Sequence, residues 1–185
     1  MVEASVAVIG GSGLYDFDAL TDLKEVKPDT PFGQPSDTIT IGTLEGVKVA
    51  FLPRHGREHR INPTNIPVRA NIFALKVLGV EHVISVSAVG SLKEDVCPLD
   101  LVVPDQLIDR TRQRYSTFFD ENLVVHVGFA DPFCPNLSNI LVEAGRKEGA
   151  IVHHGGTYVV MEGPAFSTRA ESFMYRSWGA SIIGM

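Results

Sequence analysis

An apolar run at residues 5–9 that ends in a glycine-rich turn constrains the fold more than any other feature of this chain. The turn reads Gly10-Gly-Ser-Gly13. Glycines directly after a buried strand let backbone N–H groups converge on a small anion, with the Ser12 hydroxyl as an added donor. The same residues are also typical of an ordinary tight turn. The dinucleotide-binding fingerprint fails, because Asp16 stands where its third glycine would fall.

Strand and helix patterns alternate along the rest of the chain. Strand patterns occupy residues 38–43, 47–52, 82–87, 101–103, 151–161 and 180–185, and the first two read as a hairpin. Helical periodicity covers 66–78, a second helix starts at 136, and a third starts at the capping-box spacing of Thr168 and Glu171. We expect an α/β fold with one domain, residues 1–185, and a mixed, mostly parallel central sheet flanked by helices. Since the chain ends on a strand pattern, we also expect a C-terminal part to be missing.

Each expected helix has an apolar face that we expect to lie against the core. These faces are Val68, Ile72 and Leu75 in the first helix, Leu137, Ile140, Leu141 and Ala144 in the second, and Ala170, Phe173, Met174 and Trp178 in the third.

Charge and cysteine content exclude several classes of protein. A net charge of −6 leaves no basic surface for nucleic acid or for an anionic membrane. Two cysteines are too few for a disulfide framework. The N-terminus lacks a signal-sequence pattern, and no window approaches the ~18 apolar residues of a membrane helix. We therefore expect a cytoplasmic protein that binds small anions rather than polymers.

The segment Arg54-His-Gly-Arg-Glu-His-Arg60 allows three interpretations. A guanidinium binds phosphate through two parallel hydrogen bonds, and His55 beside it could add a donor, which indicates an anion site. A solvated charged loop is the plainer alternative. His55, Glu58 and His59 also match a zinc-peptidase pattern, but that pattern requires a helix, and the prolines and glycine around the segment favour a loop.

Small residues end the strand pattern at Ser85-Val-Ser-Ala-Val-Gly-Ser91. Such residues let a ligand approach the backbone at the carboxyl edge of a parallel sheet, or they serve only helix–sheet packing. We expect Asp105 and Asp109 to lie on a solvated turn, and His153 and His154 to have structural or surface roles.

Taken in order, these segments resemble the 5'-methylthioadenosine phosphorylase branch of the purine nucleoside phosphorylase family. The resemblance rests on the glycine turn, on Arg54-His55 and on the segment Glu162-Gly-Pro-Ala-Phe-Ser-Thr-Arg-Ala-Glu171. Further family-like segments are Pro31-Phe-Gly-Gln-Pro-Ser36, Asp109-Arg-Thr111 and Asp131-Pro-Phe-Cys-Pro135.

The resemblance implies a set of site residues and an assembly. Orthophosphate would be held by Ser12, Arg54, His55, Ser87 and the backbone of Ala88. Phe166, Ser167 and Met185 would line the nucleoside pocket. The family forms homotrimers, and the position matching His126 reaches into a neighbour's pocket. No metal or other cofactor is implied, since orthophosphate is a co-substrate.

The implied reaction is phosphorolysis of a purine nucleoside, a step of purine salvage. Phosphate attacks the anomeric carbon of 5'-methylthioadenosine and releases adenine and 5-methylthioribose 1-phosphate. The catalytic residue that meets the purine is unknown here, since the family places it beyond the position of Met185. Ala165 departs from the arginine common in this motif. A preference for inosine, guanosine or methylthioinosine stays open, as does a non-catalytic fragment that binds nucleoside or phosphate.

Overall fold

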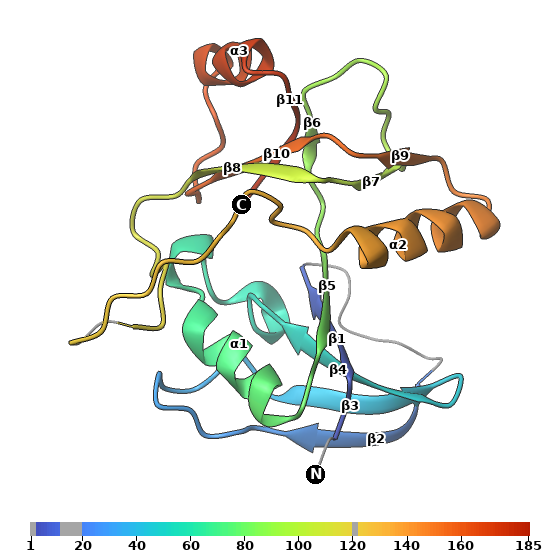
Figure 1. The fold of residues 1–185 in the computed structure, drawn as a ribbon, viewed down its shortest axis with the longest axis vertical. Coiled ribbons are helices and arrows are strands. Elements are labelled where there is room, and N and C mark those ends of the chain that lie inside the picture. The colour runs from blue at the N-terminus through green and yellow to red at the C-terminus, as the bar shows by residue number, and fades with distance from the viewer. Residues whose placement is uncertain (1–2, 12–19, 120–121) are drawn as a thin grey trace. The chain divides into compact units, whose positions relative to one another are not determined.

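The structure, a computed structural model, describes residues 3–11, 20–119 and 122–185 (Figure 1). The chain divides into two compact units. Unit 1 comprises residues 1–88 and 114–120, and unit 2 comprises residues 89–113 and 121–185. Both units combine strands with helices, which confirms the α/β class. The expectation of a single domain stays a prediction.

Unit 1 is built on a five-stranded mixed sheet with the strand order β2-β3-β4-β1-β5. The strands are β1 (Val6–Gly10), β2 (Thr21–Val26), β3 (Ile39–Leu44), β4 (Val47–Pro53) and β5 (His82–Val86). β1 lies between β4 and β5 and is parallel to both, whereas β2, β3 and β4 pair antiparallel. The predicted hairpin is confirmed as β3 and β4, joined at Glu45 and Gly46, which both have positive φ. β2 was not predicted, because its sequence is largely polar and exposed.

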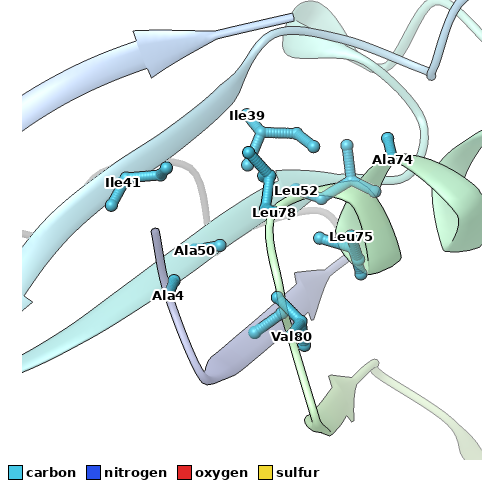
Figure 2. Close-up of a cluster of buried hydrophobic side chains, with 10 residues drawn as sticks. Ala4, Ile39, Ile41, Ala50, Leu52, Ala74, Leu75, Leu78 and Val80 are labelled. Atoms are coloured by element: carbon cyan, nitrogen blue, oxygen red, sulfur yellow. The ribbon is translucent and has the colours of Figure 1, made fainter. Parts of the chain in front are cut away.

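The core of unit 1 lies between the sheet and helix α1 (Val68–Val77). Figure 2 shows side chains from β3, β4 and α1 gathered in this cluster, with Ile39, Leu52 and Leu75 almost fully buried. The predicted helix is confirmed, but its predicted face is partly wrong, because Ile72 is exposed. The face that α1 buries is formed by Ala70, Asn71, Ala74 and Leu75. The sequence did not predict this face, because most of its residues are alanines or an asparagine rather than large apolar residues.

Unit 2 contains a four-stranded sheet, with the order β6-β11-β10-β8, and a two-stranded sheet. The strands are β6 (Gly90–Ser91), β7 (Leu101–Val103), β8 (Gln106–Arg110), β9 (Val152–His154), β10 (Thr157–Met161) and β11 (Ala180–Gly184). β10 lies between β8 and β11 and is parallel to both. The predicted long strand at 151–161 is wrong: positive φ at Gly155 and Gly156 divides it into β9 and β10, which pair in different sheets.

Two helices complete unit 2. Helix α2 (Pro135–Lys147) begins after Cys134 rather than after the predicted Asn136, with Pro135 in its first turn. Helix α3 (Arg169–Ser177) begins with the predicted capping box, which is confirmed. Their predicted faces are only partly right: Val142 and Tyr175 are the buried positions, whereas Ile140 and Phe173 are 61% exposed.

Two short 3-10 helices, η1 (Arg57–His59) and η2 (Pro63–Asn65), follow β4. Among the residues that the structure describes, no helix is long and apolar enough to cross a membrane. β5, predicted as a buried strand, is largely exposed, because β1 is its only partner among the described strands. β11, by contrast, is buried along its whole length, as predicted.

Candidate functional site

One group of candidate site residues lies in unit 1, where three neighbouring parallel strands end. Gly10, the last residue of β1, is in register with Pro53 of β4 and with Val86 of β5. The residues that follow these three strands, Gly11, Arg54 and Ser87, therefore leave the sheet at one edge. The carboxyl edge of parallel strands is where α/β proteins bind ligands.

Arg54 is anchored to this edge through both its backbone and its side chain. Its backbone N–H donates to Gly10 O at 3.1 Å, and its Nη1 donates to Val86 O at 3.2 Å. Gly11 N–H also donates to Val86 O, at 3.0 Å. The guanidinium thus lies next to Gly11, so a positive charge sits beside a glycine backbone that admits close approach.

His55 closes the loop that follows β4. The residue is 4% exposed, its Nδ1 lies 2.8 Å from Ile61 O, and Ile61 N–H donates to His55 O at 2.9 Å. Burial lowers the pKa of His55, and the charges of Arg54 and Arg114 act in the same direction, although the hydrogen bond to Ile61 O opposes them. Because a carbonyl only accepts, the neutral ring carries its proton on Nδ1. Nε2 is then an acceptor, and donation from Nε2 to an anion requires a protonated ring.

The zinc alternative lacks the geometry that it needs. Residues 57–59 form a 3-10 turn in which Glu58 and His59 have φ values of 65° and 56°, so the segment is not an α-helix. The His55 and His59 rings instead stack at 4.2 Å between centroids. Within the described ranges, no group of three metal-ligating side chains is present.

The remaining predicted phosphate-binding residues have different outcomes. Ser12 lies outside the described residues. Ser87 and Ala88 follow β5 at the same edge as Arg54, with Ser87 half-buried and Ala88 exposed. The structure thus brings a guanidinium, a hydroxyl-bearing residue and glycine backbone to one edge of a sheet, and these are the groups that hold a small oxyanion.

A separate group of candidate site residues lies in unit 2, at the carboxyl edge of its four-stranded sheet. The carboxyl ends of β8, β10 and β11 meet there, since Val160 is in register with Asp109 and with Gly184. Glu162, directly after β10, accepts hydrogen bonds from the backbone N–H groups of Arg112 and Gln113, the second at 3.0 Å. One carboxylate therefore ties the segment after β8 to the segment after β10.

The predicted nucleoside-binding residues all lie in unit 2. Met185 follows β11 and packs against the unit 2 core, so it belongs to this edge. Phe166 and Ser167 lie between β10 and α3; Phe166 is 82% exposed, and Ser167 Oγ is 2.8 Å from Ser172 Oγ. His126 lies in an exposed segment, residues 123–129, that forms neither helix nor strand.

Of the two acidic residues expected on a solvated turn, Asp105 lies in an exposed bend after Pro104 as predicted, whereas Asp109 does not lie in a turn. Asp109 belongs to β8, and its Oδ1 accepts from Thr111 N–H at 2.7 Å. Asp105 precedes β8 and accepts from Gly156 N–H at 2.9 Å. β8 was missed because Pro104 and the two aspartates resemble a turn. His153 Nε2 lies 2.7 Å from Asp100 Oδ2, a contact in keeping with its expected structural role.

Asp37 is a residue of the site region that the sequence did not reveal. Its carboxylate accepts hydrogen bonds from Arg57 N–H at 2.7 Å and from Thr38 N–H at 2.8 Å, and its Oδ2 is 3.3 Å from Arg60 Nη2. Burial raises the pKa of Asp37, but these three hydrogen bonds outweigh it and hold that pKa below its ordinary value. The twenty-residue separation from Arg57 gave no signal in the sequence.

Comparison with known proteins identifies relatives of the whole chain. Residues 5–185 match the phosphorylase superfamily. An S-methyl-5'-thioadenosine phosphorylase from Synechocystis sp. is 58% identical over 188 residues, which cover 100% of this chain and 58% of the relative. The chain spans about three fifths of the length of the curated relatives it matches.

Solved structures of methylthioadenosine phosphorylases share the fold. A methylthioadenosine phosphorylase from an antarctic soil metagenomic library has a TM-score of 0.96 and 55% identity, covering 100% of this chain and 66% of that one. A methylthioadenosine phosphorylase from Schistosoma mansoni, in complex with adenine, has a TM-score of 0.93 and 37% identity, covering 98% of this chain and 73% of that one.

Proposed function

The chain belongs to the phosphorylase superfamily, in its methylthioadenosine phosphorylase branch, and from this membership we propose that the protein is a pentosyltransferase. It cleaves the N-glycosidic bond of 5'-methylthioadenosine with orthophosphate and yields adenine and 5-methylthioribose 1-phosphate. The observation that carries the proposal is the shared edge of β4, β1 and β5, where Arg54, Gly11 and Ser87 leave the sheet together.

The proposed chemistry follows from placing an anion at that edge. A phosphate oxygen attacks the anomeric carbon while the bond to the purine breaks, and the bonding electrons leave with the base. The sugar passes through an oxocarbenium-like transition state, and no covalent bond to the protein is required. Arg54 holds the anion through charge-assisted hydrogen bonds, so catalysis comes from positioning and electrostatic stabilisation. No metal or other cofactor takes part in this scheme.

Substrate choice rests on the names of the relatives and on the residue at position 167. The resemblance places glutamate at this position in the 6-oxopurine branch, whereas this chain has Ser167, whose hydroxyl contacts Ser172. The Schistosoma mansoni structure contains adenine, which supports a 6-aminopurine. Phe166, Ser167 and Met185 form the nucleoside-binding wall in this proposal.

The direct test is release of base by the full-length protein. Adenine released from methylthioadenosine only when phosphate is present is the expected result, with inosine and methylthioinosine assayed alongside. Adenine released equally well without phosphate would indicate a hydrolase and would contradict the proposal. Faster cleavage of inosine would reassign the substrate but keep the reaction.

Arg54→Ala tests the anion site itself. Loss of a charge-assisted contact costs about 1.5–3 kcal/mol, so the Kd for phosphate should rise tenfold or more. Arg146→Ala, in the exposed last turn of α2, is the matched control and should leave phosphate binding unchanged. Equal phosphate affinity in both variants would remove Arg54 from the site.

The exposed segment 123–129 supports a homotrimer in which His126 enters the pocket of a neighbouring copy. Leu123, Val124, Val127 and Phe129 are 55–79% exposed, an apolar run that a subunit contact would cover. Light scattering on the full-length protein should give three times the chain mass. A monomer that retains full activity would contradict this assembly. The cytoplasmic location remains a prediction.

A further inference from the structure

The loop that carries Arg54 and His55 is held in an unusual conformation. Gly56, Glu58 and His59 all have φ between 56° and 71°, in the left-handed region that residues other than glycine seldom adopt. A backbone of this kind persists only where neighbouring groups fix it from outside. The contacts within the loop come from His55 and Ile61, which bond to each other, and from His59 N–H, which donates to Gly56 O at 3.2 Å.

Asp37 supplies two of the contacts that reach the loop from outside, and both lie at its left-handed stretch. Its Oδ2 accepts from Arg57 N–H at 2.7 Å and lies 3.3 Å from Arg60 Nη2, so one carboxylate oxygen spans the left-handed stretch. Its side chain is only 13% exposed, whereas that of Arg60 is 60% exposed. The shielded carboxylate is therefore the fixed partner of this pair.

Asp37 is itself fixed to the core of unit 1. Ser36 N–H donates to Asn71 Oδ1 at 2.7 Å, and Asn71 Nδ2 donates to Ser36 Oγ at 2.8 Å. Both residues are 3% exposed, and Asn71 belongs to α1. Arg60 Nη2 also donates to Ser36 O at 3.2 Å. A continuous set of hydrogen bonds thus runs from α1 through residues 36–37 to the loop that begins at Arg54.

We propose that Asp37 is a positioning residue for phosphate binding: it holds the loop 54–61 so that Arg54 meets the anion at the sheet edge. The inference rests on the proposed function. Asp37 touches neither phosphate nor nucleoside in this account and acts only through the loop. Its loss should therefore raise KM for phosphate while KM for the nucleoside stays close to that of the wild type.

Asp37→Asn tests the inference with little change in size. The asparagine side chain keeps one accepting oxygen, but its NH2 group cannot accept a hydrogen bond. The hydrogen bonds accepted by one of the two carboxylate oxygens of Asp37 are therefore lost. We expect calorimetry on the full-length protein to show about tenfold weaker binding of inorganic phosphate, the effect of one charge-assisted contact. Glu25→Gln is the matched control: Glu25 pairs with the Arg57 side chain and not with its backbone, so phosphate binding should be unchanged.

A double-mutant cycle separates positioning from general loosening of the fold. If Asp37 acts through Arg54, adding Asp37→Asn to Arg54→Ala should weaken phosphate binding no further. Effects that multiply would overturn the inference, as would wild-type phosphate affinity in Asp37→Asn. Should that variant fail to fold, Arg60→Met removes one bond to an intact Asp37, and two- to threefold weaker phosphate binding is expected; unchanged binding would again overturn the inference. If the wild type itself binds no phosphate, the proposed function falls together with the inference.

Discussion

Gly11 lies so close to Arg54 that a Cβ at residue 11 would come within 2.8 Å of Nη1 and 2.9 Å of Nη2. The position therefore matters less for backbone freedom than for the space that it leaves to the guanidinium. The nearest atoms belong to the end of a flexible side chain, so they can move away without disturbing the sheet.

Gly11→Ala should displace the Arg54 guanidinium and weaken phosphate binding. We expect the Kd for phosphate to rise on the order of tenfold, because a charge-assisted contact is lost. The free energy of unfolding should change little. Gly46→Ala should give the opposite result. Gly46 has a φ of 83°, which is unfavourable for alanine, so the free energy of unfolding should fall by about 1 kcal/mol while phosphate binding stays unchanged. Equal phosphate affinity in Gly11→Ala and the wild type would contradict this placement of Arg54.

His55 should make stability depend on pH near neutrality. Burial holds the pKa of His55 in the folded state below the ordinary value of 6.5. Above that value the ring is neutral in both states. Between the ordinary pKa and the lower pKa of the folded state, His55 takes up a proton in the unfolded chain but stays neutral in the folded protein. The free energy of unfolding therefore decreases as pH falls through this range. Chemical unfolding between pH 8 and pH 5 should show a smaller decline for His55→Gln than for the wild type. Parallel curves would contradict the prediction.

Thr168→Ala should destabilise the start of α3. Thr168 Oγ1 accepts from Glu171 N–H at 3.2 Å, and Glu171 Oε2 accepts from Thr168 N–H at 2.7 Å. Loss of such a cap costs about 1 kcal/mol of unfolding free energy. Thr168→Ser keeps the hydroxyl and should retain most of the stabilisation that the cap provides. Because Phe166 and Ser167 directly precede the cap, KM for the nucleoside should also rise in the alanine variant. If alanine and serine gave equal stability, the cap would have no energetic role.

Leu75→Ala should be among the most damaging substitutions in unit 1. Leu75 is 1% exposed, and truncation leaves a cavity, so the unfolding free energy should fall by roughly 2–5 kcal/mol. Val77→Ala, on the same helix but 53% exposed, is the control and should change it by about 0.5 kcal/mol or less. Denaturant titration distinguishes the two, and similar losses would place the core elsewhere.

Elements that depend on residues close together in the sequence could be predicted from it. The β3–β4 hairpin and the α3 capping box follow from residues within a few positions of one another, and both are confirmed. Helix faces were harder, because α1 buries Ala70 and Ala74 while Ile72 stays exposed. The split of residues 151–161 depended on two adjacent glycines with positive φ, which a weak alternation pattern concealed.

For two of the predicted site residues, one charged and one with a hydroxyl, the position at a sheet edge could be reached from the sequence. Arg54 and Ser87 each follow a strand, so parallel pairing with β1 was enough to bring them to one edge. The contacts that support the site were out of reach, because Asp37 meets Arg57 and Asn71 meets Ser36 across 20 and 35 residues of sequence. Long-range side-chain pairs of this kind depend on the assembled fold. The structure places Arg54 and Ser87 at one sheet edge, but the binding roles of all the predicted site residues remain predictions: Ser12, Arg54, His55, Ser87, Ala88, Phe166, Ser167, Met185 and His126.

The pairing of Gly10 with Pro53 fixes the direction in which the following arginine points. Successive side chains of a strand face opposite sides, so one residue inserted within β4 would turn Arg54 toward the other face of the sheet. Single substitutions around this edge are therefore compatible with the position of Arg54. Lengthening or shortening β4 by one residue is not, because it would remove the Arg54 guanidinium from the edge. Insertions tolerated by the chain should fall in the turn at Glu45 and Gly46, where strand length is unaffected.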